Sequence, residues 1–100
     1  MSHQGLVVVG PLGRVELTGA ALASLVARST EAVEGVQLRS RRRLNVVVDR
    51  SVVRVEIGVE AAAGTQLGDV GESIQHSVAR AVSAATGLST QVDVTFEVIA

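Results

Sequence analysis

The chain has 100 residues, which suffices for one domain with one hydrophobic core, and we expect residues 1–100 to form a single unit. It has no cysteine, which excludes disulfides, thiolate metal sites and thiol nucleophiles, and Phe96 is its only aromatic residue, which excludes base-stacking platforms and aromatic cages. Nine basic residues, all of them Arg, against ten acidic ones give a net charge of -1, which disfavours binding that depends on nucleic-acid phosphates.

The beginning of the chain is expected to be extended. Residues 5–9 are typical of a short strand or N-terminal arm, placed within residues 1–11, and residues 14–17 resume an alternating pattern after a turn at residues 10–13. The first twenty residues lack a signal-peptide pattern, and no segment has the roughly 20 apolar residues that span a bilayer. We therefore expect the mature chain to be the whole chain, cytoplasmic, with no transmembrane segment of its own.

A first helix is expected between Thr18 and Gly35. Thr18 can cap its N-terminus, and Gly35 can end it in a left-handed conformation. The apolar residues at helical spacing are Leu22, Leu25, Val26 and Val33. The face that we expect to be polar or small carries Arg28, Thr30, Glu31 and Glu34.

The pattern changes to a period of two between residues 36 and 61, which indicates a β-hairpin. An even register closed at residues 49–52 gives the facing pairs Val48–Val53, Val46–Val55 and Asn45–Glu56. Both apolar sets then lie on the same side of the sheet. Arg50-Ser51 is poor chemistry for a two-residue turn, so a longer loop remains an alternative.

A second helix and a last strand complete the chain. Thr65 can cap this helix and Gly87 can end it, and its apolar stripe consists of Leu67, Val70, Ile74, Val78, Ala81 and Val82. The strand at residues 91–99 points Val92, Val94, Phe96 and Val98 inward. The expected fold is α+β, in the order strand-helix-strand-strand-helix-strand, with two helices packed on one face of a mostly antiparallel or mixed sheet of about four strands.

Two segments resemble the alkaline shock protein family of bacterial envelope stress proteins. They are E-A-V-E-G-V at residues 31–36 and A-V-S-A-A-T-G-L at residues 81–88, which leads into a strand that carries D-V-T-F-E-V at residues 93–98. The resemblance covers about residues 12–99. It implies a non-enzymatic bacterial stress-response or envelope-associated adaptor that acts through protein-protein interaction, with a peripheral position at the inner membrane through a membrane-anchored partner.

This sequence departs from the family pattern in two places. The Gly-rich insert of many members is reduced here to residues 37–43, and the aromatic residue usual near the start of the second helix is missing. Because both regions can shape the choice of partner, the resemblance does not identify a particular one. The expected sheet has edge strands that could meet a second copy, so a homo-oligomer is also considered.

The strongest local feature is the Arg39–Arg43 segment, from which we take Arg39, Arg41, Arg42 and Arg43 as candidate partner-binding residues. Their guanidinium groups could bind phosphates, anionic headgroups or an acidic protein. In the hairpin register Arg41 falls opposite Glu60, so a solvated, partly paired strand end is the alternative interpretation. The alternative function is a small nucleic-acid-binding domain that uses this Arg39–Arg43 cluster together with the G-x-x-G spacing of residues 68–71.

Catalytic, cofactor and metal sites are not indicated. His76 has Glu72 one turn before it, which is typical of a surface pair and supplies too few ligands for a metal. Serines in the expected helices have no base that the sequence pairs with them. We therefore expect a protein that is not an enzyme and needs no cofactor, and that works through a protein partner.

Overall fold

The computed structural model of this chain describes residues 3–37 and 43–99. In chain order the elements are β1 (Leu6–Gly10), β2 (Gly13–Leu17), α1 (Gly19–Glu31), β3 (Val36–Gln37), β4 (Leu44–Asp49), β5 (Val52–Ala62), α2 (Leu67–Thr86) and β6 (Ser89–Ile99). The α+β class and the expected order of strands and helices are confirmed. Two details differ, because β1 and β2 form a separate two-stranded sheet and the short β3 joins the larger one.

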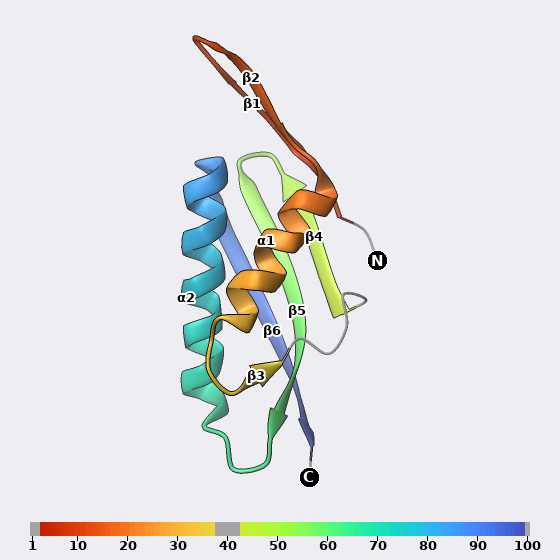
Figure 1. The fold of residues 1–100 in the computed structure, drawn as a ribbon, viewed down its shortest axis with the longest axis vertical. Helices are drawn as coiled ribbons and strands as arrows, with labels where there is room; N and C mark the ends of the chain where they lie inside the picture. Colours follow the sequence, from red (N-terminus) through yellow and green to blue (C-terminus); the bar gives the residue numbers. More distant parts are fainter. Residues whose placement is uncertain (1–2, 38–42, 100) are drawn as a thin grey trace.

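The larger sheet has four strands and is mixed (Figure 1). Its centre is β5, which pairs in parallel with β6 along its whole length. On its other side β5 pairs antiparallel with β4 and, near its C-terminal end, with β3. Two parallel neighbouring strands need a crossover connection, and α2 supplies it between β5 and β6.

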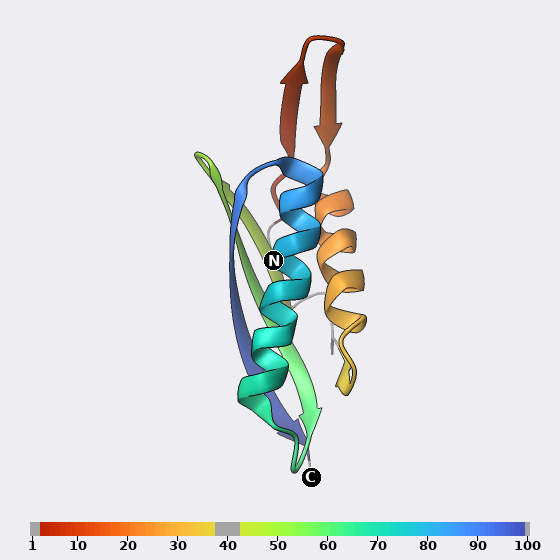
Figure 2. The same ribbon diagram turned by 90° about the vertical axis from the view of Figure 1, so that its left-hand side faces the viewer.

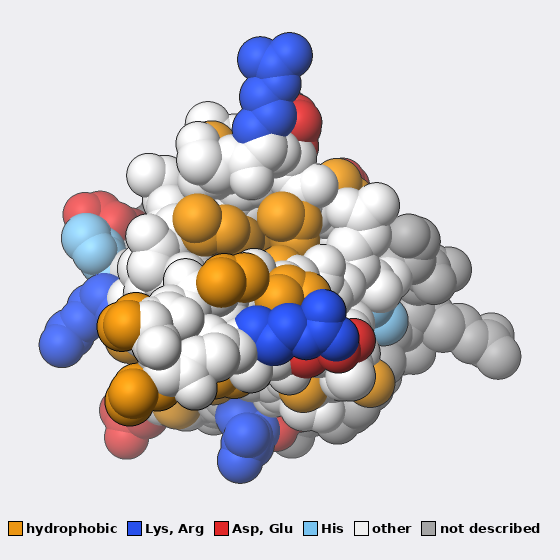
Figure 3. Space-filling view, turned by 90° about the horizontal axis from the view of Figure 1, so that it is seen from above, with side chains coloured by type: hydrophobic (Ala, Val, Ile, Leu, Met, Phe, Trp, Pro, Cys, Tyr) orange, Lys and Arg blue, Asp and Glu red, His pale blue; other side chains and the backbone are white. Residues whose placement is uncertain are grey.

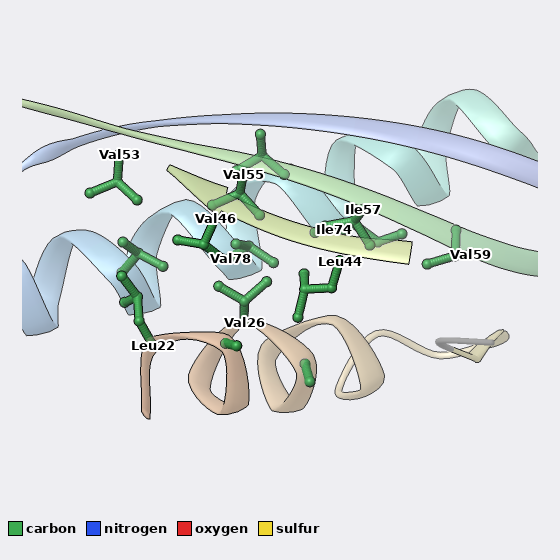
Figure 4. Close-up of a cluster of buried hydrophobic side chains, with 14 of the residues drawn as sticks. Leu22, Val26, Leu44, Val46, Val53, Val55, Ile57, Val59, Ile74 and Val78 are labelled. Atoms are coloured by element: carbon green, nitrogen blue, oxygen red, sulfur yellow. The ribbon is translucent and has the colours of Figure 1, made fainter. Parts of the chain in front are cut away.

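The core lies between this sheet and the two helices, which both cover one face of it (Figure 2). It is built almost entirely from aliphatic side chains on α1, α2, β4 and β5 (Figure 4). The expected hairpin register is confirmed, with Val48–Val53, Val46–Val55 and Asn45–Glu56 as facing pairs. The side-chain period of two therefore brings one apolar set of each strand to the helices.

Helix α1 begins as expected, because the Thr18 hydroxyl accepts a hydrogen bond from the Ala21 amide at 3.1 Å. It ends at Glu31, so Gly35, although left-handed with φ of 81°, lies beyond the helix rather than ending it. The expectation that Thr30 belongs to the polar face is wrong, because its side chain is fully buried. Its hydroxyl donates to the Val26 carbonyl at 2.9 Å, which satisfies the polar group inside the core.

Helix α2 begins slightly later than expected. Gln66 occupies its N-cap without a side-chain cap bond, and the Thr65 hydroxyl instead donates to the Ala62 carbonyl at 2.6 Å. Gly87 caps the C-terminus with φ of 73°, as expected. Ile74, Val78 and Val82 form the fully buried centre of the expected stripe.

The β4–β5 hairpin closes through the two-residue turn Arg50–Ser51, so the longer loop is not needed. Arg50 adopts φ of 57°, a left-handed conformation that costs a residue with a side chain about 1–2 kcal/mol. We expect Arg50→Gly to raise the free energy of unfolding by about 0.5–1 kcal/mol, since the greater unfolded-state entropy of glycine offsets part of the gain. Urea denaturation measures this change.

Ser51→Gly is the matched control, because Ser51 does not share the positive φ and glycine there should only lower stability. A stability loss at both positions would mean that residue 50 carries no left-handed strain.

Candidate functional site

Strands β1 and β2 and their turn, residues 6–17, form a hairpin that we call the arm. The two strands pair antiparallel with each other from Leu6–Leu17 to Gly10–Gly13 and belong to no other sheet. The arm projects beyond both helices and the larger sheet (Figure 1). It accounts for much of the elongated shape, which measures 51 × 23 × 20 Å along its principal axes.

The root of the arm is held where the chain crosses itself closely. Gly5 lies against the backbone of residues 17–19, and Gly19 lies against the backbone of His3, so a side chain at either glycine would collide with main-chain atoms. This crossing seats Gln4 on the outer edge of β4. The backbone amide of Gln4 donates to the Val46 carbonyl at 3.1 Å, and the backbone amide of Val48 donates to Oε1 of the Gln4 side chain at 2.8 Å.

The arm carries exposed apolar side chains. Among the residues whose side chains the structure describes, which excludes Val98 and Ile99, the exposed large hydrophobic residues all lie in it, namely Val7, Val8, Val9, Leu12 and Val15. Val9 is 78% exposed and Leu12, at the turn, is fully exposed. Figure 3, which looks down on the arm, shows hydrophobic side chains gathered in the middle of this end of the molecule. Such a grouping marks an interaction surface more often than isolated surface hydrophobics do.

The pairing divides the arm into two unlike faces. Val8 and Val15 lie opposite each other on one face, in line with the partly buried Leu6 and Leu17 at the root. On the other face Val9 pairs with Arg14 and Val7 with Glu16. The guanidinium of Arg14 and the carboxylate of Glu16 are 4.0 Å apart and largely solvent-exposed, so this contact adds little stability by itself.

Of the four predicted partner-binding arginines, only Arg43 lies among the described residues; Arg39, Arg41 and Arg42 lie outside them. Arg43 is exposed and lies on the sheet face that the helices leave open. Its side chain lies directly over Gly58, where a Cβ atom would come within 2.5 Å of Nε. A shallow depression of about 200 Å³ beside it is lined by Arg43, Asn45, Glu56, Ile57, Gly58 and Thr95.

The expected pairing of Arg41 with Glu60 involves a residue that lies outside the described ones. In the antiparallel ladder Glu60 faces Gln37 of β3, whereas the β4 ladder ends with Leu44 opposite Ile57. The two ladders therefore do not share one continuous register. A prediction that extends the alternating pattern of β4 towards the N-terminus does not include this change of register between the two ladders.

The remaining sequence candidates lie on helix α2. Residues 68–71 are helical, not a phosphate-clamping loop, and Gly71 leaves room for the ring of Phe96, 3.3 Å from where a Cβ would be. His76 is exposed and lies 3.9 Å from Glu72, a surface pair as expected. In the part of the chain that the structure describes, no group of three His, Cys, Asp or Glu residues could hold a metal ion.

Two further findings bear on the function. Among the described residues, no helix is both long and apolar enough to cross a membrane. Comparisons of the chain with protein-family models, with curated proteins and with solved structures give no match.

Proposed function

We propose that this chain is a non-enzymatic adaptor that acts through protein-protein interaction, of the bacterial envelope-stress type that the alkaline shock resemblance implies, and that the arm is its binding element. The observation that supports this most is the location of the large exposed hydrophobic side chains: those that the structure describes all lie in the arm. A partner anchored in the inner membrane would then hold the adaptor at the envelope.

The energetics of the arm support a bound state. Fully burying a Val or Leu side chain contributes about 1.5–3 kcal/mol, so Val9 and Leu12 together could contribute about 3–6 kcal/mol before the costs of association. An isolated two-stranded hairpin is only marginally stable in water. Among the described residues no further strand pairs with β1 or β2, so the outer edge of each can accept a strand through main-chain hydrogen bonds.

The test is affinity capture from a lysate of the source cells, treated with nuclease and analysed by mass spectrometry. The Val9→Thr, Leu12→Gln variant removes apolar surface from the arm, whereas the matched Val9→Ile, Leu12→Met variant keeps it. Both positions are largely exposed, so each variant should stay within about 0.5 kcal/mol per substitution of wild-type stability.

We expect the wild type and the apolar variant to retain the same proteins, envelope proteins among them, and the polar variant to lose them by about tenfold or more, as the lost burial of two side chains requires. If the wild type, the apolar variant and the polar variant retain these proteins equally, the arm is not the binding element. Retention of nuclease-sensitive ribosomal or nucleoid material alone would favour the nucleic-acid alternative instead.

A further inference from the structure

The free edge of β2 has a defined set of outward backbone groups. The two-residue turn makes Gly10 and Gly13 a hydrogen-bonded pair, and along an antiparallel ladder such pairs alternate with non-hydrogen-bonded ones. Val15 therefore points its N–H and C=O inward, to Val8 of β1. Arg14 and Glu16 point theirs outward, where they have no partner strand among the described residues.

These outward groups restrict how two copies of β2 could pair antiparallel. A register that puts Arg14 opposite Arg14, or Glu16 opposite Glu16, places like charges side by side, which is destabilising. The register centred on Val15 instead puts Arg14 of each copy opposite Glu16 of the other. It gives two opposite-charge pairs and uses the outward backbone groups of the same two residues.

We infer that the arm binds a second copy of this chain, with the two β2 edges paired antiparallel about a two-fold axis at Val15. This rests on the proposed role of the arm as a binding element and names the occupant of its β2 edge. The pairing is isologous, because the same residues face each other in both copies. The two arms then form one four-stranded sheet. A lone hairpin is only marginally stable in water, and a sheet of three or more strands is more stable.

The same register also joins the apolar parts of the two arms. Val8 and Val15 share one face of the hairpin, so the two copies place four valines side by side across the new sheet. Leu12 at each turn comes opposite Thr18 at the root of the other arm, which would give the fully exposed leucine a neighbour. Opposite charge fixes the register while the valines contribute buried apolar area.

Charge reversal tests this pairing by sedimentation velocity over a range of concentrations. Arg14→Glu gives two Glu–Glu pairs and Glu16→Arg two Arg–Arg pairs across the axis, so each should raise the dimer Kd by at least about tenfold. The double variant restores both pairs with reversed sign. An equimolar mixture of the two single variants restores them as well, in a heterodimer, although each alone remains dissociated.

The reversals should leave the fold intact, because Arg14 faces Val9 and Glu16 faces Val7 across the arm. Each single reversal also replaces the Arg14–Glu16 contact within one copy by like charges, but both side chains are largely solvent-exposed, so this costs little stability. A second measurement uses the absence of native cysteine. Val15→Cys should crosslink to itself across the two-fold axis under mild oxidation, since directly opposed, non-hydrogen-bonded residues have the closest Cβ atoms. Val9→Cys, on an outer strand of the paired arms, should not.

A wild type that remains monomeric at all concentrations, or dimers that charge reversal leaves unchanged, would overturn the inference. The proposed adaptor function fails separately. If the wild type is monomeric but the polar arm variant loses its captured proteins, the adaptor role stands and the self-pairing is wrong. If charge reversal and its rescue behave as expected but capture of other proteins does not depend on the arm, self-pairing stands and the adaptor role is wrong.

Discussion

Leu44→Ala is expected to lower the free energy of unfolding by about 2–5 kcal/mol, the largest effect of any single change considered for this chain. Leu44 is fully buried on β4 opposite Ile57, and it lies between the sheet and α1 (Figure 4). Truncation removes apolar burial and leaves a cavity that the neighbouring strand and helix only partly fill. Urea denaturation, with the slope compared between variants, measures the change.

Leu12→Ala is the matched control, because it makes the same chemical change at a fully exposed position. It should stay within about 0.5 kcal/mol of the wild type at concentrations where the chain is monomeric. Comparable losses at both positions would mean that the arm packs against the body rather than projecting from it.

Gly19→Ala is expected to lower the free energy of unfolding by about 1–3 kcal/mol, despite the better helix propensity of alanine. The added methyl group would meet the backbone of His3, so the segment before the arm must leave the edge of β4. Two hydrogen bonds to β4 would then be lost, from the Gln4 backbone amide to the Val46 carbonyl and from the Val48 backbone amide to the Gln4 side chain. Loss of hydrogen-exchange protection at the Val48 amide, followed by NMR, reports this directly.

Gly68→Ala provides the control for that experiment. Gly68 lies in the first turn of α2, and a methyl group there would have no neighbouring atom within 4 Å, so alanine should be neutral or stabilise by up to about 1 kcal/mol. A Gly19→Ala variant that is as stable as the wild type, with the Val48 amide still protected, would show that the root of the arm is not held by this crossing.

Much of the fold follows from periodicity in the sequence. The register of β4 against β5 is predictable because a one-residue slip would turn Val46 and Val55 out of the core. The stripe of α2 and its left-handed end at Gly87 are predictable from helical spacing and from the freedom of glycine at positive φ. These features depend on nearby residues, which a pattern can capture.

Other features depend on distant contacts, and sequence patterns miss them for that reason. Thr30 looks polar in sequence, but its hydroxyl bonds to its own helix and allows full burial. The pairing of Glu60 with Gln37 depends on β3 joining the far end of β5.

The candidate site is only partly predictable. An N-terminal arm or short strand and a turn at residues 10–13 are expected from the sequence, and they form. The valine run at residues 7–9, without polar alternation, is also typical of a strand buried on both faces. Its exposure arises because the crossing at Gly5 and Gly19 directs the hairpin away from the larger sheet, which no local pattern reveals.

Site-specific photo-crosslinking in the source cells tests most directly whether the arm is the binding element. A photoreactive residue replaces Leu12 at the turn of the arm or, as a control, the exposed Ala63 in the connection between β5 and α2 at the opposite end of the molecule (Figure 1). The account predicts protein adducts from position 12 and few or none from position 63. Adducts of equal strength at both positions, or none at position 12, would contradict it.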